Sequence, residues 1–234
     1  MKNKPNEWIS IADLMTGVVG VAVLFFVMMA MLANKIQSDG SQKDRSATQR
    51  EQQETDRQHE IDHLMENMAR AAAGQEGIHV DTDHAVIDFG DRARFESGSY
   101  RLTPEQEQLL RSFVPQVLAV ARGANGTKWL KRVVIVGFAD GEGKYLANLN
   151  LSLQRSQRVL CALLRPSAPG EAPMGIGDQD NVRRLFLVGG YSSNSAKETW
   201  KASRRIEFRL EFYAFNEQKT GYAPTDADPG PCAI

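Results

Sequence analysis

The chain has 234 residues, with 28 basic and 29 acidic side chains and a formal net charge of -1. This length accommodates one or two ordinary domains. The balanced charge argues against a protein held on nucleic acid by a basic surface, and no direct nucleic-acid partner is expected. The apolar fraction of 42% is typical of a soluble protein, but the apolar residues are unevenly distributed along the chain.

Residues 14–33 form a run of 20 residues without a charged side chain. At a rise of about 1.5 Å per residue, some 20 helical residues cross the roughly 30 Å hydrocarbon core of a bilayer. The run is longer than the apolar part of a cleaved secretory signal, and Ala30-Met31-Leu32-Ala33 has the wrong spacing for a cleavage site. We therefore expect a transmembrane helix over residues 9–33, after a cytoplasmic tail of residues 1–8.

The short N-terminal tail carries Lys2 and Lys4 against Glu7. Positive charge is enriched on the cytoplasmic side of membrane proteins, so the N-terminus is expected in the cytoplasm and the other 200 or so residues across the membrane. The two cysteines, Cys161 and Cys232, fit an oxidising compartment, where they pair or remain separate thiols.

Residues 34–77 form a polar segment with six basic and nine acidic residues and no proline. Near its end, Ile61, Leu64, Met65 and Met68 follow the i, i+3, i+4, i+7 spacing of one helix face. So narrow an apolar stripe suits pairing with a second copy of the chain better than a globular core. We expect a polar helical linker that dimerises; a lone polar helix or a flexible linker is the alternative.

From residue 78 the pattern becomes globular, with strands and helices in alternation. Thr103-Pro104-Glu105-Gln106 has the form of a capping box at a helix start. Such alternation predicts one α/β domain in which helices cover a sheet, followed by a loosely packed tail over residues 214–234. The expected elements are strands at 85–89, 133–136, 185–188 and 206–212, helices at 103–122 and 144–164, and a Pro/Gly-rich loop at 166–181.

Asp13 lies five residues into the expected membrane helix. A carboxylate in a membrane helix is costly, about 2.5 kcal/mol or more near the bilayer centre and less near its edge. Such residues generally face a protein partner or a water-filled path. One carboxylate on one helix forms no channel, so an ion path here requires other transmembrane subunits. The alternative is an interfacial Asp13 that is merely solvated.

The pattern Trp8-x-x-x-Ala12-Asp13-Leu14-Met15-Thr16, followed by a helix rich in Val, Phe and Met, resembles the transmembrane helix of MotB-type stator subunits. The resemblance implies that Asp13 is the ion-binding carboxylate. It also implies a homodimer of such helices inside a ring of MotA-like multi-span subunits. The implied ion is a proton, although Asp13 with Thr16 nearby leaves sodium open, and no other cofactor is expected.

A second set of residues follows the expected strand at 133–136. Asp140 ends Val136-Gly137-Phe138-Ala139-Asp140, and Asn148, Leu151, Ser152 and Arg155 lie on the next helix. This resembles the OmpA-like peptidoglycan-binding domain, with its G-H-T-D turn and N-x-x-L-S-x-x-R helix. Ser203-Arg204-Arg205-Ile206-Glu207 resembles the closing N-R-R-V-E strand of that family, and Arg94-Phe95-Glu96-Ser97-Gly98-Ser99 resembles its entry. The resemblance covers residues 78–213 and implies an α+β arrangement with helices on a mixed sheet.

Peptidoglycan stem peptides carry diaminopimelate, a zwitterion that needs one anion and one cation nearby. By the resemblance, Asp140 takes the ammonium and Arg155 takes the carboxylate as a fork. Asn148 holds the stem-peptide backbone and Arg204 adds a second cation. The alternative is a purely structural salt bridge between Asp140 and Arg155. Phe138-Ala139 replaces the family's His-Thr and removes two polar groups, which predicts a weaker site or a variant ligand.

The remaining sequence suggests no catalysis. His59 and His63 have the i, i+4 spacing of a metal pair, but a solvated helix face is favoured. The chain has no recognisable nucleophile arrangement and no phosphate-binding loop, so no enzyme is expected.

Together the two resemblances imply an ion-driven stator of the bacterial inner membrane, anchored to the wall by a periplasmic domain. The stretch from Ile9 to Gly20 and the short chain resemble the B subunits of Zorya anti-phage defence systems more than flagellar stators. A flagellar MotB-type subunit and a passive OmpA-like wall tether without ion flow are the alternatives.

Overall fold

The computed structural model describes residues 7–167, 169, 174–219 and 230–232, and of residues 7–14, 16 and 38–46 it describes the backbone alone. The chain divides into two compact units, Met1–Thr55 and Asp56–Ile234. The expected tails, residues 1–8 and 214–234, therefore lie partly outside the described residues.

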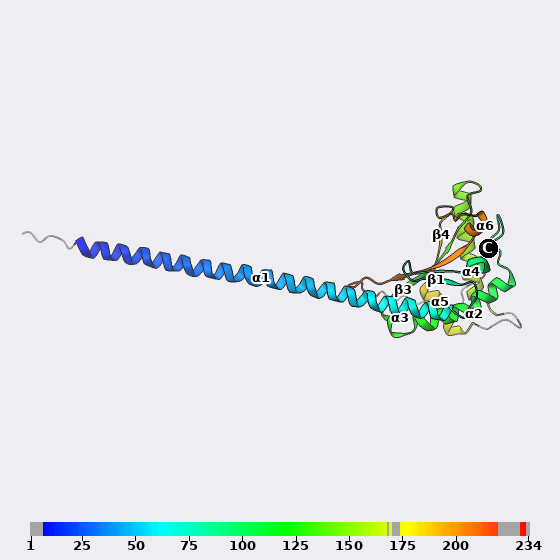
Figure 1. The fold of residues 1–234 in the computed structure, drawn as a ribbon, viewed down its shortest axis with the longest axis horizontal. Coiled ribbons are helices and arrows are strands. Elements are labelled where there is room, and N and C mark those ends of the chain that lie inside the picture. Colours follow the sequence, from blue (N-terminus) through cyan, green and yellow to red (C-terminus); the bar gives the residue numbers. More distant parts are fainter. Residues whose placement is uncertain (1–6, 168, 170–173, 220–229, 233–234) are drawn as a thin grey trace, which may run out of the picture. The chain divides into compact units, whose positions relative to one another are not determined.

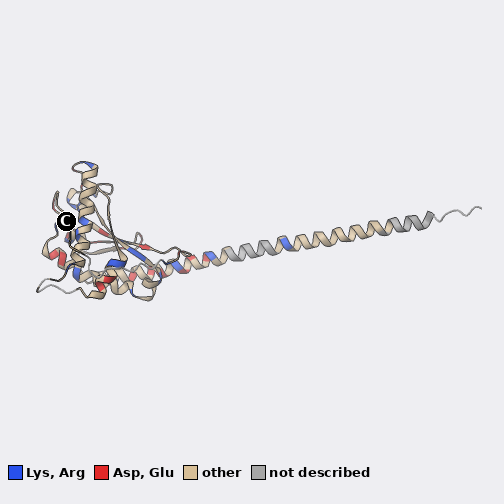
Figure 2. Cartoon of the chain, turned by 180° about the vertical axis from the view of Figure 1, so that it is seen from behind, with Lys and Arg blue, Asp and Glu red and all other residues tan. Residues whose placement is uncertain are grey.

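The described residues of the first unit all belong to helix α1 (Glu7–Ala72), which continues into the second unit. The segment Gly17–Gln37 of this helix is long and apolar enough to cross a membrane, and none of it is buried. The sequence has no charged residue from Gly17 to Asn34, and Figure 2 accordingly has a long uncharged stretch in this helix, drawn in tan. The helix runs through positions 13 and 16, but the side chains of Asp13 and Thr16 lie outside the described residues.

The second unit contains one five-stranded sheet with the strand order β1-β2-β5-β3-β4. Figure 1 shows this sheet with helices packed beside it. Strands β3 and β4 are parallel, with Val133 opposite Phe186, and the other neighbours are antiparallel. The sheet is therefore mixed, as the OmpA resemblance implies. The strands are β1 (His79–Asp81), β2 (Val86–Asp88), β3 (Leu130–Gly137), β4 (Phe186–Gly190) and β5 (Ile206–Phe212).

Helices connect and cover these strands. Helix α2 starts at the predicted capping box, where the Thr103 backbone N–H donates to Gln106 Oε1 at 2.9 Å and the Gln106 N–H donates to Thr103 Oγ1 at 3.3 Å. The prediction of a loop over residues 166–181 is wrong for its last part, because helix α5 begins at Ile176. The helices after α1 are η1 (Gly90–Ala93, 3-10), α2 (Pro104–Ala121), α3 (Ala124–Trp129), α4 (Tyr145–Leu164), α5 (Ile176–Leu185) and α6 (Trp200–Ser203).

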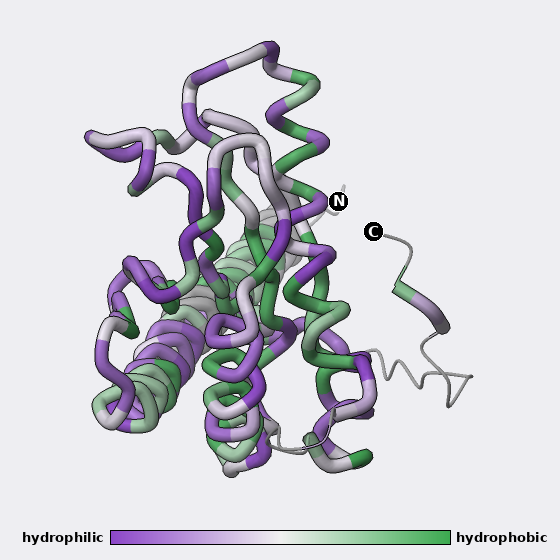
Figure 3. The backbone as a smooth tube through the Cα atoms, turned by 90° about the vertical axis from the view of Figure 1, so that its right-hand side faces the viewer, coloured by the Kyte–Doolittle hydropathy of each residue, from purple (hydrophilic) through white to green (hydrophobic). Residues whose placement is uncertain are grey.

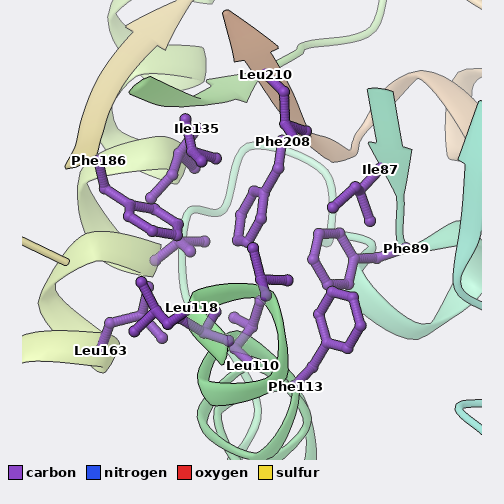
Figure 4. Close-up of a cluster of buried hydrophobic side chains, with 14 of the residues drawn as sticks. Ile87, Phe89, Leu110, Phe113, Leu118, Ile135, Leu163, Phe186, Phe208 and Leu210 are labelled. Carbon is purple, nitrogen blue, oxygen red and sulfur yellow. The ribbon is translucent and has the colours of Figure 1, made fainter. Parts of the chain in front are cut away.

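The core lies between one face of the sheet and helices α2 and α4 (Figure 4). Phe208 at the centre of β5 packs edge-to-face on Phe89 and Phe186, with ring centroids 4.7 and 5.6 Å apart. Leu110 and Phe113 of α2 are fully buried against this cluster. Hydrophobic and hydrophilic stretches alternate along the backbone (Figure 3), consistent with elements that bury one face.

The apolar stripe near the end of α1 belongs to this same core. Ile61, Leu64, Met65 and Met68 are at most 5% exposed and are buried among the core residues of their own domain. The dimer contact expected of this stripe is therefore wrong, because the domain already covers these side chains. The second unit accordingly begins at Asp56, upstream of the expected start at residue 78.

Polar contacts hold the same helix segment in place. Glu60 accepts hydrogen bonds from Trp129 Nε1 at 2.6 Å and from Lys128 Nζ at 2.7 Å. Arg57 Nε donates to the carbonyl of Tyr213 at 2.9 Å. Near the C-terminal end of the chain, Cys232 is joined by a disulfide to Cys161 on α4, with Cα atoms 5.8 Å apart. The disulfide ties residues 230–232 to α4.

Candidate functional site

Two glycines bring helix α4 directly against the ends of β3 and β4. A Cβ atom on Gly137 would lie 1.9 Å from the carbonyl oxygen of Ser152, and one on Gly190 would lie 2.7 Å from Ser152 Oγ. Only a residue without a side chain permits this approach. The loop after β3, which carries Asp140, therefore starts in contact with α4.

Side chains of α4 then hold two loops in place. Asn148 Nδ2 donates to the carbonyls of Asp140 and Glu142 at 3.1 and 2.7 Å. Ser152 Oγ accepts the backbone N–H of Ser192 at 3.0 Å. The expected contact of Asn148 with the ligand backbone stays a prediction; in the structure its Nδ2 group holds the loop that presents Asp140.

Arg155 is also directed inward. Its guanidinium donates to three backbone carbonyls, those of Phe138 at 2.6 Å, Ser99 at 2.9 Å and Glu96 at 3.1 Å. The residue has no exposed surface. The expected fork toward a ligand carboxylate is therefore not formed in the structure, because the protein's own carbonyls occupy the donors.

Electrostatics around Arg155 agree with this burial. Removal from water lowers the pKa of Arg155 to about 10, with Asp140 opposing the shift and Arg204 adding to it. The carbonyl oxygens around the guanidinium replace part of the lost solvation. Arg155 thus acts as a fixed positive charge beneath the loop that carries Asp140.

Asp140 forms an ion pair with Arg204, and both side chains keep a small exposed fraction. Arg204 Nη1 donates to Asp140 Oδ2 at 3.1 Å, and Arg204 Nε donates to the carbonyl of Phe95 at 2.9 Å. The two side chains are 8% and 16% exposed. Among the described residues, neither Asp140 Oδ1 nor Arg204 Nη2 has a hydrogen-bond partner.

The alternative expected from the sequence is a structural salt bridge between Asp140 and Arg155. This salt bridge does not form, because the ion-pair partner of Asp140 is Arg204. The pair places an anion and a cation side by side, each with one unused polar atom. Such a pair can bind a zwitterion, because the carboxylate accepts from an ammonium while the guanidinium donates to a carboxylate.

The residues that replace the family's His-Thr lie beneath this surface. Phe138 and Ala139 are buried, and the guanidinium carbon of Arg205 lies 3.9 Å from the centroid of the Phe138 ring. This is a cation–π contact. Arg205 in turn donates to Glu207 at 2.7 Å. The replacement therefore exchanges polar groups for a packed aromatic layer under the loop.

The remaining candidate metal ligands, His59 and His63, add no further site among the described residues. His59 and His63 contact each other edge-to-face with centroids 4.4 Å apart, and no group of three potential metal ligands occurs among the described residues. Sequence reasoning missed the roles of Glu96, Ser99 and Ser192. Their contributions are backbone groups, which leave no residue-type signal; only the resemblance of residues 94–99 to the family's entry segment indicated that this part matters.

Fold and site together define a protein with an apolar N-terminal helix and an OmpA-like domain, and residues 94–185 match the OmpA family. The chain is 38% identical over 223 residues to the Zorya protein ZorB of Escherichia coli O139:H28 (strain E24377A / ETEC). That alignment covers 95% of this chain and 87% of its relative. The chain therefore belongs to the ZorB family.

Solved structures are similar at lower identity. The cell wall anchor of the T6SS from Pseudomonas aeruginosa is 21% identical, with a TM-score of 0.43 over 62% of this chain and 97% of that chain. The periplasmic domain of Helicobacter pylori MotB (residues 78–256) is 13% identical, with a TM-score of 0.40 over 56% of this chain and 78% of that one.

Proposed function

We propose that the protein is the wall-anchored stator subunit of an ion-driven rotary motor in the bacterial inner membrane, acting in anti-phage defence without catalytic activity of its own. Membership of the ZorB family supports the defence role over a flagellar one. The apolar segment Gly17–Gln37 supports a single membrane crossing, with the N-terminus in the cytoplasm and the OmpA-like domain in the periplasm.

The wall anchor is the Asp140–Arg204 pair. The observation that carries this assignment is the pair of unused atoms, Asp140 Oδ1 and Arg204 Nη2, on adjacent side chains of opposite charge. Diaminopimelate in the stem peptide presents an ammonium to Asp140 and a carboxylate to Arg204. Arg155 and Asn148 act beneath the pair, by holding the loops that present it.

The test is co-sedimentation of the full-length protein, in detergent, with purified peptidoglycan. A hydrogen bond to a charged group contributes about 1.5–3 kcal/mol, so Asp140→Asn and Arg204→Gln should each weaken binding at least about tenfold. Lys201→Gln, which removes one positive charge from an exposed residue of α6, is the matched control. Unchanged sedimentation of both site variants would contradict the assignment.

The motor part of the proposal rests on Asp13, with Thr16 nearby. Two copies of the membrane helix lie inside a ring of MotA-like multi-span subunits, and their periplasmic domains are fixed to the wall. Asp13 takes up a proton from the periplasmic side and releases it to the cytoplasm, and each cycle changes its electrostatic attraction to the ring. The membrane potential supplies about 2.3 kcal/mol per charge per 100 mV; sodium in place of the proton would act through the same carboxylate.

The decisive variant for the motor is Asp13→Asn, which keeps the size of the side chain and removes its charge. We expect loss of phage protection in cells that carry the variant, with membrane level and peptidoglycan binding unchanged. Full protection by Asp13→Asn would overturn ion translocation and leave the passive wall tether, which uses the Asp140–Arg204 pair alone.

A further inference from the structure

A cavity lies at the start of β3, whereas Asp140 follows the end of that strand. The cavity has a volume of about 280 Å³. It is bounded by the end of α2, by α3, by α5 and by the residue that follows β5. The polar side chains that line it are Arg122, Thr127, Lys131, Asn181, Arg184 and Tyr213.

The lining of this cavity is basic and includes no acidic side chain. Arg122 Nη1 pairs at 2.6 Å with Asp178, which lies outside the lining. The other guanidinium nitrogens of Arg122 have no partner among the described residues. Lys131 pairs with Glu217. The hydrogen bond from Lys131 and that from the Ala214 backbone N–H lower the pKa of Glu217.

A third cation of the lining, Arg184, has no carboxylate partner. Its side chain is exposed and forms no hydrogen bond or ion pair within the described part of the chain. Lys219 lies outside the lining, with Nζ 5.8 Å from the Tyr213 ring centroid, and donates to the carbonyl of Thr127 at 2.6 Å. The three basic side chains of the lining therefore have two carboxylate partners, Asp178 and Glu217, and the site retains positive charge.

The neutral groups of the lining are mostly satisfied within the protein. Asn181 Nδ2 donates to the carbonyl of Gly177 at 2.8 Å, and Thr127 Oγ1 donates to the carbonyl of Arg122 at 3.2 Å. The hydroxyl of Tyr213 has no hydrogen-bond partner among the described residues. An anion in the cavity would meet unused donors on Arg122, Arg184 and Tyr213.

We propose that this cavity binds a phosphate-bearing anion through Arg184, Arg122 and Lys131, with the Tyr213 hydroxyl as an additional donor. Guanidinium groups match phosphate oxygens with two parallel hydrogen bonds. The volume is below the range of about 300–1,000 Å³ typical of pockets for larger organic ligands. It suits a single phosphate mono- or diester group.

Two sources can supply this group, a phospholipid headgroup or a soluble phosphate. The chain between Gln37, the last residue of the apolar segment, and Asp56, the first of the second unit, is 18 residues long. The structure describes this segment as part of helix α1, in which 18 residues extend about 27 Å. The headgroups of the membrane that holds the apolar segment are one source to be tested.

The experiment uses the full-length protein in a non-ionic detergent and measures binding by isothermal titration calorimetry. One arm adds inorganic phosphate, and the other adds detergent-dispersed phosphatidylglycerol, with phosphatidylcholine for comparison. Arg184→Gln is the test variant, because the Arg184 side chain is exposed and forms no hydrogen bond or ion pair with the described residues. Lys201→Gln on α6 is the control for loss of one charge.

We expect saturable binding of at least one anion, weakened about tenfold or more by Arg184→Gln and unchanged by Lys201→Gln. Binding of both anions, or of phosphatidylglycerol alone, assigns a lipid headgroup site; binding of inorganic phosphate alone assigns a soluble ligand. No saturable binding in either arm, or equal binding by the wild type and Arg184→Gln, would overturn the proposal. None of these outcomes bears on the Asp140–Arg204 site.

Discussion

The close approach of α4 to β3 predicts a large effect for one added methyl group. In Gly137→Ala, the new Cβ would lie 1.9 Å from the Ser152 carbonyl oxygen and 2.9 Å from its carbonyl carbon. Ordinary contacts between non-bonded heavy atoms are about 3.5 Å. The atoms in the way belong to the backbone of a helix, so α4 must retreat by at least about 1 Å.

The loss of folding stability in Gly137→Ala follows from this displacement. Overpacking a close-packed region lowers the free energy of unfolding by about 1–3 kcal/mol. Because the added methyl group of Gly137→Ala meets backbone atoms, we expect a loss at the upper end of this range. For a domain of this size, each kcal/mol lowers the melting temperature by roughly 2–4 °C. We therefore expect a decrease of about 6–12 °C. The shift of α4 also lengthens the 2.6 Å bond from Arg155 to Phe138, so peptidoglycan binding should weaken as well.

The assay is thermal unfolding of the full-length protein in detergent, followed by near-UV circular dichroism because this signal reports side-chain packing. Gly141→Ala is the matched control: it makes the same substitution four residues later, where an added Cβ meets nothing within 4 Å. If Gly137→Ala and Gly141→Ala melt at the same temperature, the close contact between α4 and β3 is refuted.

Three further predictions concern stability. Hydrogen bonds from Lys128 and Trp129 hold the pKa of Glu60 below its ordinary 4.5, so this contribution is present above pH 4.5 and lost as the pH falls through the lowered value. Glu60→Gln should therefore unfold in less urea than wild type at pH 7, and this difference should shrink as the pH is lowered below 4.5; a difference that stays constant with pH would contradict the ionic contact. Cys161→Ser opens a cross-link spanning 71 residues and should lower the free energy of unfolding in urea by about 2–4 kcal/mol. If reduction of the wild type leaves its unfolding in urea unchanged, this prediction is contradicted. Asn148→Asp sets a carboxylate against two carbonyls and should cost about 1–3 kcal/mol; wild-type stability would exclude this role.

Much of the fold could be predicted from local sequence signals. The capping box at Thr103 and Gln106 is complete within four residues, so the start of α2 follows from the sequence alone. The strand over Ile206–Phe212 likewise follows from alternation of apolar and charged residues. The short strand β1 and helix α3 were missed, because segments of three and six residues carry too little periodicity.

What the sequence could not predict depends on tertiary contacts. The stripe at Leu64 and Met68 reads equally well as a contact with a second copy or with its own domain, and only the position of the sheet decides between them. The same holds for the basic residues of the site. The motif places both Arg155 and Arg204 near Asp140, but three backbone carbonyls, invisible in the sequence, bury Arg155 and leave Arg204 as the accessible cation.

The central claim, that Asp140 and Arg204 together bind a zwitterion, is tested most directly by competition. Full-length protein bound to peptidoglycan is displaced with a stem tripeptide that ends in diaminopimelate, or with one that has lysine in its place and so lacks the second carboxylate. We predict that the diaminopimelate peptide displaces wild type at a concentration at least about tenfold lower, and that Arg204→Gln abolishes this preference. Equal displacement of wild type by both peptides, or an undiminished preference in Arg204→Gln, would contradict the assignment of the site.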